Sequence, residues 1–193
     1  TKNPAKEAEY RKRAADLVAQ MTLHEKVSQM LSWAPAIERL GIPAYNWWSE
    51  GIHGVGRAGT ATVFPQAIGM AAAFDEDMME QVGNAVGVEA RGKYNMCRAH
   101  GDRDIFKGLT VWAPNINIFR DPRWGRGHET YGEDPFLTSR LGVRFVEGMQ
   151  GDDPDYLQAA ACAKHYAVHS GPEAVRHEFD AVVSKQDLYE TYL

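Results

Sequence analysis

The stretch "LTVWAPNINIFRDPRWGRG" runs from Leu109 to Gly127 and changes character near its middle. Its first part, Leu109 to Phe119, is almost continuously apolar, which is typical of a strand buried on both faces of a parallel sheet. Its second part, Arg120 to Arg126, is dense in arginine and acid. In a (β/α)₈ barrel the functional residues lie at the carboxyl ends of the strands. The order of the two parts therefore predicts a buried strand that leads into a functional loop.

The rest of the chain alternates helix signals with short apolar runs. Short strands are predicted over residues 42–48, 61–65 and 159–169. Helices are predicted over residues 5–20, from a capping box at Thr22 to Leu31, from about Asp75, from about Asp134 (with Pro135 in its first turn and Gly151 past its end), and after an N-cap at Ser184. This alternation predicts a parallel β/α architecture.

Two parallel architectures compete, an open doubly wound sheet and a closed (β/α)₈ barrel. The first strand is not followed by Gly-x-Gly-x-x-Gly, which weakens the dinucleotide-binding version, although an NAD-binding protein stays open from architecture alone. Polar clusters follow three predicted strands, which is the barrel pattern. A complete barrel needs about 250 residues, and we count roughly four β/α units. Residues 1–193 are therefore predicted to form the N-terminal part of a TIM-barrel-like domain.

Composition narrows the function classes. The 193 residues are 44% hydrophobic and 24% charged, with a net charge of −5, which is typical of a soluble globular domain. This mild acidity argues against a nucleic-acid partner, and the lack of a long apolar run argues against a membrane span. Two cysteines are too few for a disulfide framework, and the polar N-terminal helix signal does not resemble a signal peptide.

Glu50 and Arg126 are the first two candidate binding residues. Glu50 follows Trp47 and Trp48 at a predicted strand end, where its carboxylate could accept hydrogen bonds from ligand hydroxyls beside the flat face of Trp48. The alternative is an ordinary acid in a surface loop. Arg126 lies between two glycines that permit close approach to a ligand, and its guanidinium offers a rigid fork of donors. For the other arginines of this loop, ion pairing in solvent is the simpler interpretation.

Lys164 and His165 are adjacent at the end of a buried apolar run. Burying a lysine without partners is costly, so the pair is interpreted as donors to ligand hydroxyls. His165 and His169 also have a spacing that could bind zinc on a helix, but the segment reads as strand and loop. Cys162, within an alanine run, is interpreted as a small buried core residue. Ser170 lacks the glycine pattern of a hydrolase nucleophile.

Four motifs in this order resemble the N-terminal domain of glycoside hydrolase family 3, and most of all its β-xylosidase and β-glucosidase members. They are "WWSEGIHG", "FPQAIGMAAAFD", "GLTVWAPNINIFRDPRWGRGHETYGEDP" and "CAKHYAVHSGPE". The resemblance implies a (β/α)₈-like barrel followed by an α/β sandwich domain. It also implies an exo-acting, retaining hydrolase of oligosaccharides or aryl glycosides that uses no cofactor, with two catalytic carboxyls about 5–5.5 Å apart. A secreted or periplasmic location would follow as well.

The resemblance assigns sugar-binding roles to six residues. Those that would bind the terminal sugar or lie beside it are Glu50, Arg126, Lys164, His165, Trp48 and Trp112. Trp48 would crowd the C6 side of the sugar, which favours pentoses.

Two departures from the family pattern concern catalysis. The N-acetylglucosaminidase branch carries Asp-Ser-His after its Lys-His motif, whereas this chain has Val175-Arg176-His177. The family nucleophile lies on a later strand, so Asp180 and Asp187 are too close to Lys164-His165 to be that residue. Neither catalytic carboxylate is therefore expected in this chain, whose partner would be the remaining segment of the same enzyme. A non-catalytic carbohydrate-binding fragment and a homo-oligomer stay open as alternatives.

Overall fold

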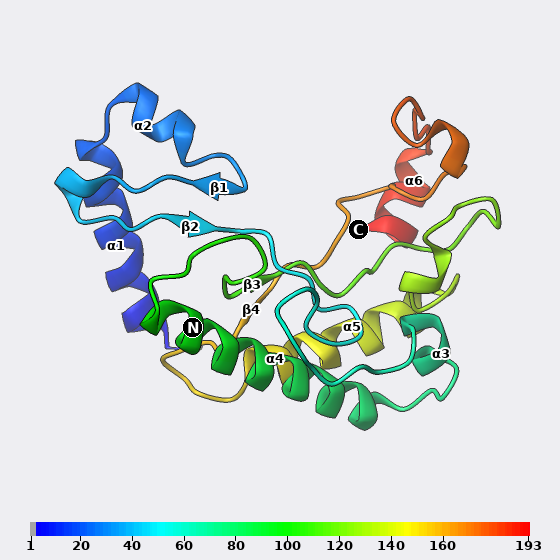
Figure 1. The fold of residues 1–193 in the computed structure, drawn as a ribbon. Helices are drawn as coiled ribbons and strands as arrows, with labels where there is room; N and C mark the ends of the chain where they lie inside the picture. Colours follow the sequence, from blue (N-terminus) through cyan, green and yellow to red (C-terminus); the bar gives the residue numbers. More distant parts are fainter. Residues whose placement is uncertain (1–2) are drawn as a thin grey trace.

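The structure is a computed structural model that describes residues 3–193 (Figure 1). Thr1 and Lys2, which the predicted domain also includes, lie outside the described residues. The α-helices are α1 (Pro4–Gln20), α2 (Leu23–Ser28), α3 (Ala67–Ala71), α4 (Glu76–Ala99), α5 (Pro135–Gln150) and α6 (Lys185–Asp187). Short 3₁₀ turns occur at η1 (Glu38–Leu40), η2 (Gly127–Glu129) and η3 (Glu173–Val175), and a π-helical turn at η4 (Leu188–Tyr192) follows α6. No described helix is long and apolar enough to cross a membrane.

Four two-residue strands form two small sheets. Strands β1 (Trp33–Ala34) and β2 (Tyr45–Asn46) pair antiparallel, and β3 (Thr110–Val111) and β4 (Ala160–Ala161) pair parallel. Isolated parallel bridges then join Ser49 to Val111 and Asn115 to Lys164. The segment that follows β2 therefore runs parallel to β3 and its continuation, which in turn runs parallel to the continuation of β4. These three parallel segments organise the candidate site.

The strands are shorter than the sequence predicts. Within the segment 109–119 the ladder is interrupted because the backbone N–H of Ala113 donates to Val111 two residues earlier, and because Pro114 has no N–H to donate. Residues 61–65 form no strand, since the N–H of Thr62 donates to the carboxylate of Glu89 instead of to another strand. Most of residues 111–118 are buried, as predicted, whereas residues 61–65 are partly or fully exposed.

The helix boundaries agree better with the sequence. Asp75 and Asp134 accept hydrogen bonds from the N–H groups of the third helical residues and so cap α4 and α5. Thr22 and Glu25 form the predicted capping box, and Ser184 caps α6. Helix α2 ends at Ser28 rather than at Leu31. Leu31 is exposed and provides no burial to extend the helix.

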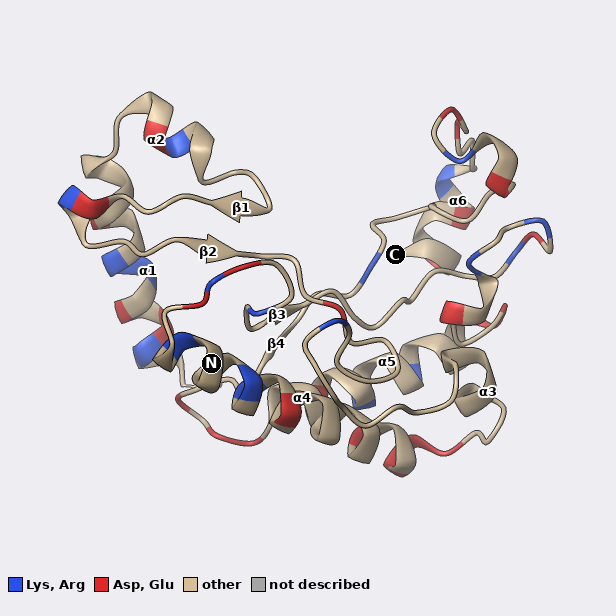
Figure 2. Ribbon diagram, in the orientation of Figure 1, with Lys and Arg blue, Asp and Glu red and all other residues tan. Residues whose placement is uncertain are grey.

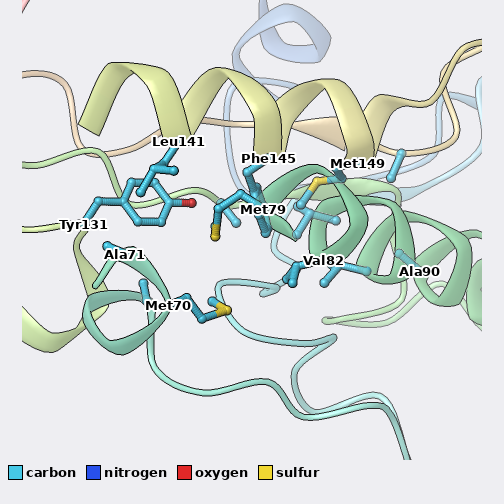
Figure 3. Close-up of a cluster of buried hydrophobic side chains, with 14 residues drawn as sticks. Met70, Ala71, Met79, Val82, Ala90, Tyr131, Leu141, Phe145 and Met149 are labelled. Carbon is cyan, nitrogen blue, oxygen red and sulfur yellow. The ribbon is translucent and has the colours of Figure 1, made fainter. Parts of the chain in front are cut away.

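The core lies where α4 and α5 pack against each other, and its cluster of buried side chains includes Val111 of β3 (Figure 3). Glycines allow the two helix backbones to touch: a Cβ at Gly83 would lie 2.3 Å from the carbonyl oxygen of Phe145, and one at Gly148 would lie 2.0 Å from that of Glu80. Leu141, Phe145 and Met149 of α5 and Met79 of α4 have no exposed surface or nearly none, and Val86 and Val111 are almost as buried. This packing fixes β3 against the helix pair.

Candidate functional site

The three parallel segments bring the predicted polar residues to one place. Glu50 follows the segment after β2, Arg126 lies in the loop after β3, and Lys164 follows β4. Figure 2 shows both positively and negatively charged residues near the middle of the molecule, where β3 and β4 lie, as well as along α1, along α4 and in the loops. Parallel strands place their carboxyl ends at the same edge of a sheet, which explains how residues far apart in the sequence meet here.

Lys164 and Glu50 form an ion pair at the centre of this edge. Lys164 Nζ lies 3.2 Å from Glu50 Oε2, and the indole N–H of Trp48 donates to Glu50 Oε1 at 3.0 Å. Lys164 is buried, whereas the side chain of Glu50 stays 31% exposed. Glu50 thus compensates a buried ammonium while it remains accessible to a ligand. The ion pair with Glu50 explains how Lys164 can be buried beyond the end of β4.

Arg126 is held by Glu129. Its Nε and Nη2 donate to the two carboxylate oxygens at 2.8 and 2.5 Å, and Asn115 Nδ2 donates to Glu129 at 3.3 Å. Burial alone would raise the pKa of Glu129, but the hydrogen bonds from Arg126 and Asn115 and the charge of Lys164 outweigh it and lower that pKa. Glu129 is therefore an anion that orients Arg126 and does not act as a proton donor.

His165 lies between Asn117 and Arg126. Its Nδ1 is 2.7 Å from Asn117 Oδ1, and its Nε2 is 3.3 Å from Arg126 Nη1. Burial, followed by the neighbouring His169, Arg126 and Lys164, lowers the pKa of His165 to about 3. The imidazole is therefore neutral at physiological pH.

Trp48 and Trp112 lie face to face beside the polar cluster. Their ring centroids are 4.7 Å apart with an interplanar angle of 20°. Trp48 is 39% exposed, and its indole N–H is used by Glu50. The pair therefore presents a fixed aromatic surface next to the Glu50 carboxylate.

Ion pairing in solvent, the interpretation given to the other arginines of this loop, is confirmed for Arg123 but not for Arg120. Arg123 pairs with Asp121 in solvent, while Arg120 donates to Ser170 and packs against the rings of Phe179 and Tyr192. Arg126 alone of these three contacts the other candidate residues.

The glycines beside Arg126 allow close packing against other side chains, a role that the sequence interpretation did not include. A Cβ at Gly127 would lie 2.3 Å from the ring of Phe119, and one at Gly125 would lie 3.0 Å from the side chain of Glu173.

Two further expectations concern Cys162 and a metal site. Cys162 is exposed, so its predicted role as a buried core residue is wrong. The backbone N–H of Cys162 donates to the carbonyl oxygens of Val111 and Ala113, so the residue is joined to the segment of β3 although its surface is exposed. His165 and His169 have ring centroids 4.2 Å apart, but residues 3–193 contain no group of three or more residues able to hold a metal ion.

Sequence reasoning missed three residues of this cluster, Asn115, Asn117 and Glu129. The asparagines are 1% and 3% exposed, although both are polar. The signal was available: two amides inside the apolar run "APNINI" need buried hydrogen-bond partners. Their partners, Glu129 and His165, are set by the tertiary fold, so the sequence alone did not name them.

Comparison with known sequences identifies the family. A family model described as "Glycosyl hydrolase family 3 N terminal domain" matches residues 13–193. The chain belongs to glycoside hydrolase family 3. A xylan 1,4-beta-xylosidase of Xylanibacter ruminicola is 50% identical over 187 residues, which cover 95% of this chain and 22% of that protein. A probable beta-D-xylosidase 7 of Arabidopsis thaliana is 48% identical over 94% of this chain and 25% of its own length.

Solved family 3 structures share the fold of the chain. A GH3 exo-beta-xylosidase in complex with a xylobiose aziridine activity-based probe matches with a TM-score of 0.82 and 37% identity, over 94% of this chain and 24% of that one. A beta-glucosidase from Streptomyces venezuelae in complex with D-glucose matches with a TM-score of 0.73 and 32% identity, over 93% of this chain and 22% of that one. The chain thus spans about a quarter of the length of these relatives.

Proposed function

We propose that this chain is the sugar-binding part of an exo-acting, retaining β-glycosidase that releases terminal xylosyl or glucosyl residues from oligosaccharides. The observation that carries the proposal is the meeting of Glu50, Lys164, Arg126 and His165 at one strand edge. Relatives named as xylosidases and glucosidases support the reaction class. The six residues proposed to contact the terminal sugar are Glu50, Arg126, Lys164, His165, Trp48 and Trp112.

The cluster alternates hydrogen-bond donors and acceptors in a way that suits hydroxyls. Lys164 and Arg126 donate only, while the carboxylates of Glu50 and Glu129 accept only. A sugar hydroxyl can accept from one member of an ion pair and donate to the other. Because each pair is already formed, the binding groups are oriented before the sugar arrives. Contacts of this kind that strengthen in an oxocarbenium-like transition state would accelerate hydrolysis.

The aromatic surface favours a pentose. Trp48 is fixed by its hydrogen bond to Glu50 and by its stacking on Trp112, so moving the indole aside would break both contacts. An indole held beside the Glu50 carboxylate would crowd a C6 hydroxymethyl group. The xylosidase names of the two sequence relatives described above agree with this preference. We therefore propose β-D-xylosides as the better substrates.

The nucleophile and the acid/base are proposed to lie in the remaining segment of the enzyme. Glu129 is ion-paired with Arg126 and Glu50 shares its carboxylate between Lys164 and Trp48, so both are assigned to binding rather than to catalysis. A cavity of about 650 Å³ lies between α5, the segment after β3 and the C-terminal turn, lined by apolar residues such as Ile116, Ile118 and Val143. We propose that the rest of a (β/α)₈-like barrel fills it and pairs with β4. The complete enzyme would act outside the cytoplasm.

Turnover of nitrophenyl glycosides tests the proposal. The full-length enzyme should hydrolyse nitrophenyl β-xyloside with a higher kcat/KM than nitrophenyl β-glucoside. Proton NMR of the first-formed sugar should show the β-anomer, because a retaining mechanism preserves configuration. The isolated chain should turn over neither substrate. Hydrolysis by residues 1–193 alone, or an α-anomer as the first product, would refute the proposal.

A further inference from the structure

We propose that Asn117 is a positioning residue that fixes His165 as the neutral tautomer with its proton on Nδ1. The Nε2 atom then presents a lone pair that accepts a hydrogen bond from a ligand hydroxyl. The identity of that ligand rests on the proposed function, whereas the tautomer rests on the contacts of Asn117. This differs from the donor role that the sequence predicted for His165.

The orientation of the Asn117 amide is determined by two backbone carbonyls. One end of the amide lies 3.2 Å from the carbonyl oxygen of His165 and 3.3 Å from that of Ala167. Carbonyl oxygens accept hydrogen bonds and cannot donate them, so this end must be the NH₂ group. The other end is then the amide oxygen, Oδ1.

The amide oxygen in turn determines the proton position on His165. Oδ1 lies 3.0 Å from the backbone N–H of His165 and 2.7 Å from its Nδ1. An amide oxygen only accepts, so Nδ1 must carry a proton to form this short contact. Asn117 is 3% exposed, so water does not compete for these bonds.

The opposite side of the ring excludes a second proton. Arg126 Nη1 lies 3.3 Å from His165 Nε2, and a guanidinium can only donate. A proton on Nε2 would set two donors against each other and place one cation beside another. The groups whose charges act on the ring are Arg126, Lys164, His169 and Glu129, and only the last favours protonation. Nε2 therefore keeps its lone pair.

Asparagine is the side chain that this arrangement requires at position 117. An aspartate could accept from Nδ1, but it has no N–H to donate to the carbonyls of His165 and Ala167. Its negative charge would also stabilise the imidazolium and raise the pKa of His165. The amide thus keeps His165 neutral where a carboxylate would charge it. Because Nε2 has a single lone pair, a hydroxyl that donates to it replaces the 3.3 Å contact from Arg126 Nη1, and the freed N–H of Arg126 can then donate to the oxygen of that hydroxyl.

Neutron diffraction from deuterated crystals of the full-length enzyme tests the tautomer directly. The inference predicts deuterium on Nδ1 of His165 and none on Nε2 at neutral pH. Deuterium on Nε2, alone or together with Nδ1, would overturn it. This readout needs no turnover. An enzyme with deuterium on Nδ1 alone that hydrolysed no glycoside would overturn the proposed function while it supported the tautomer.

The Asn117→Asp variant provides a second test through its pH profile. The variant's kcat/KM should fall at least about tenfold more than that of the wild type between pH 8 and pH 5, because protonated His165 loses its acceptor. The double variant Asn117→Asp/His165→Gln should lose this extra pH dependence. Asn95→Asp, which adds the same charge to the exposed face of α4, should keep the wild-type profile. A profile of Asn117→Asp that matched the wild type would count against the inference.

Discussion

Lys164 Nζ and Glu50 Oε2 lie 3.2 Å apart although 114 residues separate them in the sequence. Three parallel segments must be correctly aligned for this contact to form, because the register joins Ser49 to Val111 and Asn115 to Lys164. The pair therefore depends on the fold: Lys164, which follows β4, is buried, and its counter-ion Glu50 stays partly exposed.

Removing either member of this pair should reduce activity. In the full-length enzyme, Lys164→Ala and Glu50→Ala should each lower kcat/KM for nitrophenyl β-xyloside by at least about tenfold, or about 1.4 kcal/mol. Each substitution removes a proposed sugar contact and leaves its partner unpaired. Lys12→Ala disrupts an exposed ion pair with Asp16 on α1 and should leave kcat/KM unchanged. Near wild-type kinetics in both site variants would contradict the roles assigned to them.

The geometry of Arg126 predicts that charge alone is insufficient at this position. Arg126→Lys should lower kcat/KM by roughly tenfold, since an ammonium cannot form the two parallel hydrogen bonds to Glu129 while it also faces His165. Arg123→Lys is the matched control, because Arg123 lies in the same loop and pairs with Asp121 in solvent. Equal kinetics for the two variants would show that the fork of Arg126 is not used.

Protonation of His165 should make stability depend on pH. Its pKa is about 3 in the folded chain and close to its ordinary value when unfolded, so the unfolded state binds more protons between these values. The stability associated with neutral His165 is fully present above about pH 6.5 and is lost progressively as the pH falls towards 3. The thermal midpoint of the wild type should therefore drop more between pH 7 and pH 4 than that of His165→Gln. Parallel decreases would contradict the shift.

Two glycines of α4 should respond oppositely to alanine. A Cβ at Gly83 would lie 2.3 Å from the carbonyl oxygen of Phe145, whereas one at Gly92 would meet no atom within 4 Å. Gly83→Ala should lower the free energy of unfolding by at least about 1 kcal/mol, because the added methyl group forces α4 and α5 apart. Gly92→Ala should be neutral or stabilise it by up to about 1 kcal/mol, because alanine favours the helix. Thermal unfolding of both variants measures the contrast, and a lower midpoint for Gly92→Ala would argue against the packing described.

The parts of the fold that depend on local chemistry were predictable from the sequence. Asp75 and Asp134 cap helices because their side chains reach N–H groups three residues later, which a short window of sequence reveals. The extent of the strands was not predictable in this way. Their hydrogen bonds depend on segments about fifty residues away, and the ladder breaks at Pro114.

The same distinction separates the predicted site residues from those that were missed. Lys164 and Glu50 could be predicted as candidate site residues because they are charged and lie at predicted strand ends, and the structure brings them into contact. Asn117 carries no charge, and its partner His165 lies 48 residues away, so only the fold reveals what its amide does. The burial of Cys162 was predicted wrongly because an alanine run indicates an apolar segment without indicating which of its residues other parts of the fold cover.

The central claim is that these residues bind the terminal sugar, and a crystal structure of the full-length enzyme with xylose bound tests it most directly. The account predicts that hydroxyls of one xylose ring lie within about 3.2 Å of Glu50, Lys164 and Arg126, with the ring beside Trp48. A hydroxyl should also lie within hydrogen-bond distance of His165 Nε2. A xylose that occupies the catalytic centre without contacting Glu50, Lys164 or Arg126 would contradict the account.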